Sequence, residues 1–246
     1  MIRLVPILLV AAVLAAAGAG GARADGHAPV VVELFTSEGC NSCPPADDYL
    51  AELAKRPDVL ALSFHVDYWD YLGWTDRFAA PEFTRRQRAY ATTLGAAMVY
   101  TPQAVVGGAS DVIGSDRAGL DRLIDRAAAA ATLDIGLAWT ANGSLEVTLP
   151  AAPYHGAATV WFVRYDKHES SVVTAGENAG RTLDHANVVR ELKAVGMWNG
   201  TAMTLTLPAE AVRPELGSGD DYGCAVIVQP EGLGPILAAR HIDGAG

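Results

Sequence analysis

The sequence has few cysteines, few basic residues and no long apolar stretch beyond its beginning. Its 246 residues include only three cysteines, and no second C-x-x-C or H-x-x-x-H lies at the spacing of a zinc site. The 18 basic residues are outnumbered by 28 acidic ones, and no basic patch is present to attract nucleic acid. No segment reaches the roughly 20 apolar residues of a membrane-spanning helix. The composition therefore disfavours a zinc-finger, nucleic-acid-binding or membrane-spanning protein.

The beginning of the chain is typical of an export signal. Arg3 precedes the apolar run Leu4–Ala17, and Ala22-Arg23-Ala24 follows as an A-x-A cleavage pattern. We expect residues 1–24 to be a signal peptide that is removed, an uncleaved anchor being the alternative. Cleavage would remove two arginines and no acids, which changes the formal net charge from −10 to −12. The mature protein is then predicted to be periplasmic or secreted, in an oxidising compartment, without a membrane span.

The most informative motif is Cys40-Asn41-Ser42-Cys43. It lies between an apolar run, Val30–Phe35, and a helix-like stretch that begins at Pro44. At a helix start the backbone N–H groups carry partial positive charge, so the first sulfur is favoured as a thiolate, which is the form that attacks disulfides. The motif predicts a redox dithiol that closes as a Cys40–Cys43 disulfide. Half of a metal site and a permanent structural disulfide are the alternatives.

The first part of the chain alternates strand-like and helix-like segments, which predicts an α/β layer structure with parallel pairing. The expected strands are Val30–Phe35, Val59–His65 and Gln103–Val106, and the expected helices are Ala46–Lys55, Pro81–Leu94 and Arg117–Ala131.

After Leu133 the segments become short and strand-like. The expected strands are Ile135–Trp139, Leu145–Leu149, Thr159–Tyr165, Ala202–Leu207 and Ala225–Gln229. Asn142-Gly143 indicates a hairpin, and Asn187–Ala194 is the one helix-like segment. We therefore expect an α/β domain over residues 25–132, followed by a mostly antiparallel, sandwich-like β domain over residues 133–246.

The order strand, C-x-x-C, helix, strand, helix and then Thr101-Pro102 before a strand resembles the thioredoxin superfamily. Residues 31–108 contain Glu-Leu-Phe-Thr-Ser-Glu-Gly-Cys-Asn-Ser-Cys-Pro-Pro-Ala-Asp, His-Val-Asp-Tyr-Trp-Asp and Tyr-Thr-Pro-Gln. These stretches resemble more closely a secreted family with a thioredoxin-like fold, the domain of unknown function 1223. The resemblance implies a thioredoxin-like fold for the first domain and does not imply a substrate.

Several roles follow from this resemblance. Cys40, expected to be the more exposed sulfur, is the nucleophile, and Cys43 is the resolving thiol. The Thr101–Pro102 bond matches the cis-proline that faces the dithiol, whereas the alternative is a trans proline at an edge strand. Glu33 matches a buried carboxylate that accepts the proton of Cys43, and its alternative position is on a solvent-facing side of the strand.

Polar and aromatic residues after the second strand are candidates for substrate binding. His65, Asp67 and Trp69 end that strand or follow it, and the carboxyl ends of strands gather around the site in open α/β sheets. The alternative is that these side chains simply pack a loop onto the core.

Two features of the second part stay open. Arg181, His185 and Asn187 could reach toward the dithiol, or the segment could begin a helix with its charges in water. Cys224 begins an apolar strand, where inert packing is favoured over a redox role.

The leading functional hypothesis is a thiol–disulfide oxidoreductase that needs no cofactor. Its predicted partners are protein thiols and disulfides and an unidentified redox partner. A Cu(I)-handling protein that uses His65 with both cysteines, and a non-catalytic interaction module, are the alternatives. The leading hypothesis assigns no metal ligand.

Overall fold

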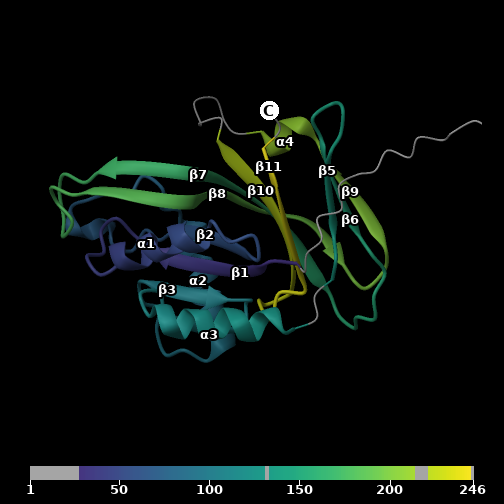
Figure 1. Cartoon of the computed structure of the whole chain (residues 1–246), viewed down its shortest axis with the longest axis horizontal. Coiled ribbons are helices and arrows are strands. Elements are labelled where there is room, and N and C mark those ends of the chain that lie inside the picture. The colour runs from purple at the N-terminus through teal and green to yellow at the C-terminus, as the bar shows by residue number, and fades with distance from the viewer. Residues whose placement is uncertain (1–27, 131–132, 214–220, 245–246) are drawn as a thin grey trace, which may run out of the picture.

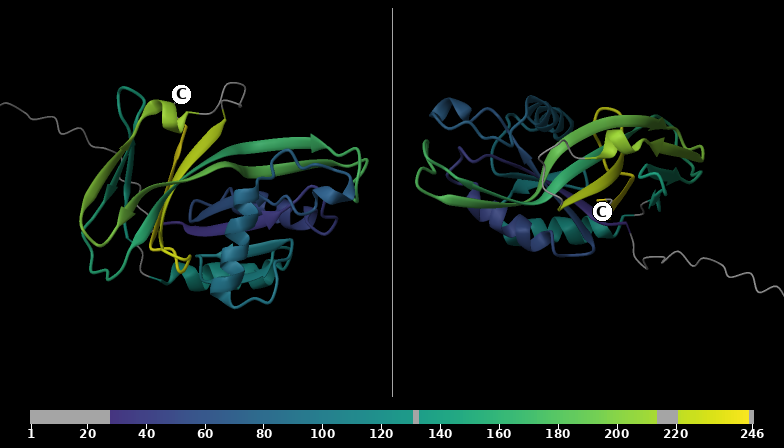
Figure 2. Two further views of the ribbon diagram at one scale, coloured as in Figure 1. Left: turned by 180° about the vertical axis from the view of Figure 1, so that it is seen from behind. Right: turned by 90° about the horizontal axis from the view of Figure 1, so that it is seen from above.

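The computed structural model describes residues 28–130, 133–213 and 221–244, so the predicted signal peptide lies outside the described residues. The strands form an eight-stranded sheet in the order β11-β10-β7-β8-β2-β1-β3-β4 and a three-stranded sheet in the order β5-β6-β9 (Figures 1 and 2).

The elements of the first part are β1 (Val30–Thr36), α1 (Pro44–Leu53), β2 (Val59–His65), η1 (Asp70–Leu72), α2 (Pro81–Leu94), β3 (Gln103–Val106), β4 (Ser110–Ile113) and α3 (Arg117–Ala128). Those of the second part are β5 (Gly136–Trp139), β6 (Leu145–Leu149), β7 (Ala158–Val172), β8 (Thr182–Trp198), β9 (Met203–Leu207), α4 (Ala209–Val212), β10 (Tyr222–Pro230) and β11 (Ala238–Asp243).

Local signals account for the first part. Strand β1 is rich in valine and is buried along its whole length, as expected for a central strand covered on both faces. Helix α1 begins with two prolines, whose missing N–H groups are not needed in a first helical turn. Helix α2 starts at Pro81 and ends at Gly95, which adopts the left-handed conformation that glycine tolerates best. These elements agree with the sequence prediction, although α3 ends earlier than expected.

Strands β1 and β2 pair in parallel, but β3 pairs antiparallel to β1, which the expected parallel layer did not include. On one face of β1, alternate residues pack against α1 and α3. On the opposite face, Val31 and Phe35 join a core cluster with α2 and with β7 and β10 of the second part.

A long hairpin connects the two parts of the chain. Strands β7 and β8 have 15 and 17 residues and pair antiparallel from Ala158 with Trp198 to Val172 with Thr182. Strand β8 also joins β2 through the pair Ser63 and Val188. The closed end of the hairpin extends past α1, at the left of Figure 1, and the other end reaches the three-stranded sheet.

The predicted fold class is therefore wrong. The described residues are mostly β, and one eight-stranded mixed sheet contains strands from both parts of the chain, so they do not form a small thioredoxin-like domain followed by a separate sandwich. The error came from residues 187–194, which favour a helix by composition but lie within β8, where pairing with β7 outweighs local propensity. Within the described residues, no helix has the length and apolar character to cross a bilayer.

Candidate functional site

The dithiol forms a disulfide at the amino end of α1. Two turns follow β1: the N–H of Cys40 donates to the carbonyl of Ser37, and the N–H of Cys43 donates to that of Cys40. Cys43 caps the helix, and its Cα lies 5.4 Å from that of Cys40 in the Cys40–Cys43 disulfide. The hydroxyl oxygen of Ser42 lies 3.4 Å from Cys40 Sγ. The sulfurs therefore occupy the positive end of a helix dipole, with a polar group beside the first.

Both sulfur-bearing residues are buried, which corrects the expectation that Cys40 is exposed. Cys40 is 1% exposed and Cys43 is 0% exposed. The turn between β7 and β8 is attached to the dithiol loop, because the side-chain amide of Asn178 donates to the carbonyl oxygens of Glu38 at 2.9 Å and of Cys40 at 3.0 Å. The N–H of Asn41 donates to the Glu177 carboxylate at 3.4 Å. A turn from the second part is thus hydrogen-bonded to the loop that carries the disulfide.

The structure brings the predicted proline to the same end of the sheet. The Thr101–Pro102 peptide bond is cis, as predicted. A Cβ atom added at Gly114 would lie 3.3 Å from Pro102 Cβ and 3.1 Å from Ala46 Cβ, so the proline lies close to the first turn of α1. The Trp69 indole donates to the Thr101 hydroxyl at 2.8 Å. Trp69 also packs on the dithiol loop, since its Cβ would lie 3.0 Å from a Cβ at Gly39.

The other two residues predicted to bind substrate point elsewhere. His65 is fully buried, and its Nδ1 lies 2.7 Å from Asp76 Oδ2. Asp67 accepts a hydrogen bond from the Thr84 hydroxyl of α2 at 2.6 Å. Of the predicted substrate-binding residues, Trp69 is therefore the one that contacts both the dithiol loop and the proline loop.

Glu33 occupies neither of its two predicted positions. Alternation along β1 directs it to the α2 face, opposite the face on which α1 packs. There its carboxylate, which is 0% exposed, accepts hydrogen bonds from Arg86 Nε at 2.9 Å and Nη2 at 2.7 Å. The same guanidinium donates to Gln229 of β10 at 2.9 Å. Glu33 therefore takes part in a buried ion pair that ties α2 to β1 and β10, and faces away from the dithiol helix.

A cluster of buried titratable side chains adjoins the dithiol segment, since Glu38 precedes Cys40 by two residues and Asp47 follows Cys43 by four. It comprises Glu38, Asp47, His65, Asp76 and His185, none more than 4% exposed. His185 Nε2 lies 3.5 Å from Glu38 Oε1 and its Nδ1 lies 4.0 Å from Asp47 Oδ2. The two histidine rings meet edge to face at 4.7 Å. We call these five residues the buried carboxylate–histidine cluster.

The pKa values in this cluster diverge. Burial raises the pKa of Asp47 to about 7, against the opposing effect of His185. Burial also acts to raise the pKa of Glu38, but the His185 ring and hydrogen bonds, including one from the Trp74 indole, hold it below its usual value. Burial also acts to raise the pKa of Asp76, but His65 and the backbone N–H groups of Glu38 and Phe78 together hold it below its usual value. Asp47 is therefore the carboxyl group of the cluster poised to gain or lose a proton near neutral pH.

Sequence reasoning did not assign Glu38, Asp47 or Asp76 to the site. A signal for Asp47 was present, because a residue four positions after Cys43 lies on the same helical face. The sequence left open whether Arg181, His185 and Asn187 reach toward the dithiol, and the structure places His185 against Glu38 and Asp47. His185 belongs to β8, which lies too far along the chain from Cys40 and Cys43 for a local sequence pattern to indicate the contact.

Within the described residues, no group of three or more histidine, cysteine, aspartate or glutamate side chains could hold a metal ion. His65, which the copper-handling alternative would use, is paired with Asp76. Cys224 is a free, buried cysteine in the core between β10 and the three-stranded sheet, and burial raises its pKa to about 12. That position agrees with inert packing.

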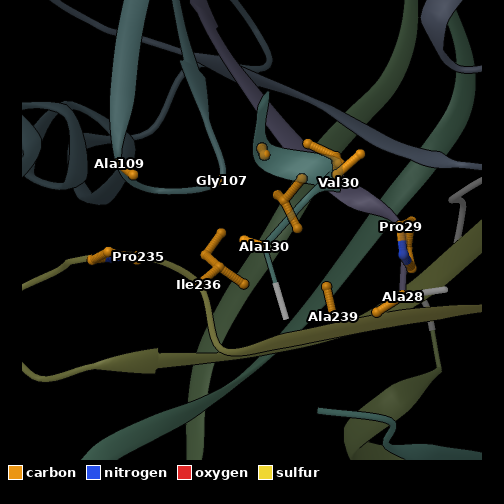
Figure 3. A pocket seen from close by; sticks show the side chains of 12 residues that line it. Ala28, Pro29, Val30, Gly107, Ala109, Ala130, Pro235, Ile236 and Ala239 are labelled. Atoms are coloured by element: carbon orange, nitrogen blue, oxygen red, sulfur yellow. The ribbon is translucent and has the colours of Figure 1, made fainter. Parts of the chain in front are cut away.

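A cavity of about 110 Å³ lies away from the dithiol. Its apolar lining includes Val30 at the amino end of β1, together with Gly107, Ile236 and Ala239 (Figure 3). The dithiol follows the opposite, carboxyl end of β1, so this cavity is not part of the candidate site.

Comparisons with known proteins give one family and similar solved structures. Protein AGR_C_4864 from Agrobacterium tumefaciens has a solved structure that matches with 37% sequence identity and a TM-score of 0.76, over 89% of this chain and 96% of that one. HBP35 of Porphyromonas gingivalis matches in fold, with 16% identity and a TM-score of 0.59 over 88% of this chain and 75% of that one. A search of curated proteins gave no match. The model of the family described as protein of unknown function (DUF1223) matches residues 31–229, and the chain therefore belongs to that family.

Proposed function

We propose that this protein is a thiol–disulfide oxidoreductase that acts on protein substrates through Cys40 and Cys43. The observation that carries the proposal is the disulfide at the amino end of α1, where outward-pointing N–H groups favour a thiolate. The Ser42 hydroxyl is a further donor for a thiolate at Cys40. The resemblance of residues 31–108 to the thioredoxin superfamily supports the same chemistry, although it does not extend to the fold of the whole chain.

The reaction is a pair of thiol–disulfide exchanges. A substrate thiolate attacks Cys40 Sγ, which forms a mixed disulfide and releases Cys43 as a thiolate. A second substrate thiol, as thiolate, then attacks the substrate sulfur of the mixed disulfide and releases Cys40. The substrate loses two electrons and gains a disulfide, while the protein gains both electrons as a dithiol. The reverse sequence reduces a substrate disulfide, and the reduction potential decides the direction in the presence of a redox partner.

We also propose that the protein works outside the cytoplasm. The supporting observations are the export signal pattern in residues 1–24 and the disulfide, which persists in oxidising compartments. Cell fractionation with detection of the processed chain tests this proposal.

The decisive test is turnover with a protein substrate. The mature protein should accelerate reduction of insulin by dithiothreitol, or reoxidise a reduced test protein, and Cys40→Ser should abolish both activities. Cys224→Ser is the matched control, since its thiol lies in a separate core and should not contribute. Equal activity of Cys40→Ser and the unmodified protein would remove the proposal.

Burial of both sulfurs favours a second candidate function, a non-catalytic interaction module with a permanent disulfide. The two functions differ in the accessibility of Cys40. After reduction, mild alkylation should modify Cys40 rapidly in an oxidoreductase, whereas a module would react only when it unfolds.

A further inference from the structure

Asp47 lies one helical turn after Cys43, on the same face of α1. Its backbone N–H donates to the Cys43 carbonyl at 3.1 Å, and both residues are buried. Side chains four residues apart on a helix have Cβ atoms about 5–6 Å from each other. The carboxyl group is therefore within reach of the Cys43 thiol, directly or through one water molecule.

The surroundings of Asp47 suit a group that exchanges a proton. His185 from β8 lies 4.0 Å from it and 3.5 Å from Glu38, Asp76 acts on Asp47 through its charge, and the neighbouring Asp48 is exposed. These two contacts of His185 are longer than ordinary hydrogen bonds, and the Thr36 hydroxyl is a further polar group that acts on the Asp47 carboxyl group. Asp47 is therefore held loosely enough to exist with or without its proton.

We propose that Asp47 takes the proton of Cys43 when the disulfide closes and returns it when the disulfide opens, and that His185 tunes this exchange. The inference rests on the proposed oxidoreductase function and assigns its proton acceptor. Asp47 takes the role that the sequence suggested for Glu33, which faces α2 instead. His185, from the second part of the chain, would thus be a positioning residue for the disulfide exchange at Cys40 and Cys43 in the first part.

The closing step balances as follows. With a mixed disulfide on Cys40, the Asp47 carboxylate accepts the Cys43 proton, and the Cys43 thiolate attacks Cys40 Sγ. The Cys40–Cys43 bond forms, the bond from Cys40 to the substrate sulfur breaks, and the substrate leaves as a thiolate. The proton stays on the Asp47 carboxyl group until it passes to the substrate thiolate or to water. Burial and His185 together place the pKa of Asp47 at about 7, where both directions are accessible.

The test follows the two exchange steps separately. Reduced full-length mature protein is mixed with 5,5′-dithiobis(2-nitrobenzoate), and the release of coloured thiolate is recorded by stopped flow across a range of pH. The first release reports attack by Cys40, and the second reports attack by Cys43 on the mixed disulfide. Asp47→Asn should slow the second release by about 10²-fold or more, the usual effect of a general base, and remove its inflection near neutral pH. Asp48→Asn is the control: the Asp48 charge makes only the smallest of the contributions to the pKa of Asp47, so both releases should be nearly unchanged.

His185→Gln provides an independent variant if Asp47→Asn fails to fold. Because His185 lowers the pKa of Asp47, its removal should move the inflection of the second release to higher pH. A second release that is as fast in Asp47→Asn as in the unmodified protein would overturn the inference about Asp47 but not the proposed function. The same holds if His185→Gln leaves the pH of the inflection in the second release unchanged. Absence of the first release, or its persistence in Cys40→Ser, would instead contradict the proposed oxidoreductase function.

Discussion

Access to the disulfide is predicted to depend on Asn178, which fastens the turn between β7 and β8 over the dithiol loop. The side-chain amide makes two buried hydrogen bonds, at 2.9 and 3.0 Å, to the carbonyl oxygens of Glu38 and Cys40. A buried hydrogen bond contributes about 0.5–1.5 kcal/mol net, so Asn178→Ala should favour opening of the turn by about 1–3 kcal/mol. Since 1.4 kcal/mol is a factor of ten, the open population should rise about 5- to 150-fold.

The rate of disulfide reduction reports this population. When opening and closing are fast relative to the exchange reaction, the rate is proportional to the fraction of open molecules. Asn178→Ala should therefore be reduced by dithiothreitol about 5- to 150-fold faster than the unmodified protein, at a temperature where both are folded. Trapping with an alkylating agent and counting free thiols measures the rate.

Glu177→Gln is the matched control from the same turn. Its contact with the Asn41 N–H is longer, at 3.4 Å, and exposed, so its loss should change the rate less than threefold, the effect of about 0.5 kcal/mol or less. If Asn178→Ala is reduced no faster than the unmodified protein, the turn does not limit access and the reasoning is refuted. Thermal unfolding of both variants excludes a global loss of structure as the cause of faster reduction.

Two further predictions concern stability. Arg86→Met leaves the Glu33 carboxylate buried without its partner and should lower the free energy of unfolding by about 3–5 kcal/mol in urea titrations, whereas a loss below 1 kcal/mol would mean that the pair is not enclosed as described. Burial raises the pKa of Asp47 to about 7, so the contribution of this group to stability, up to about 4 kcal/mol, is lost as pH rises from about 4 to about 7. Because Asp47→Asn lacks this contribution, its stability relative to the unmodified protein should rise over that range, and a difference between the two proteins that is the same at pH 4 and pH 8 would contradict the prediction.

Local sequence signals were sufficient for the elements that carry the dithiol. Valine-rich β1, the two prolines that open α1, and Pro81 with Gly95 at the ends of α2 each act over a few residues, and the structure has them as predicted. The Asn142-Gly143 hairpin between β5 and β6 is also confirmed, with Gly143 at a φ of +77°.

What the sequence could not supply depends on partners far along the chain. Residues 187–194 favour a helix by composition, and only pairing with β7 makes them a strand. The position of Glu33 is set by Arg86, which lies 53 residues away, and the cover over Cys40 is set by Asn178, 138 residues away. The sequence shows which residue types are present, but it does not show which distant residues come into contact.

The pairing of β8 with β2 has a consequence for the modularity of this chain. A fragment that stopped after α3 would leave β2 as an unpaired edge strand. It would also lack His185, whose ring packs against that of His65 at the end of β2. Unpaired edges of this kind invite association with other chains. The dithiol segment of this protein therefore cannot be moved to another protein on its own, because the hairpin that contacts it, β7 with β8, comes later in the chain.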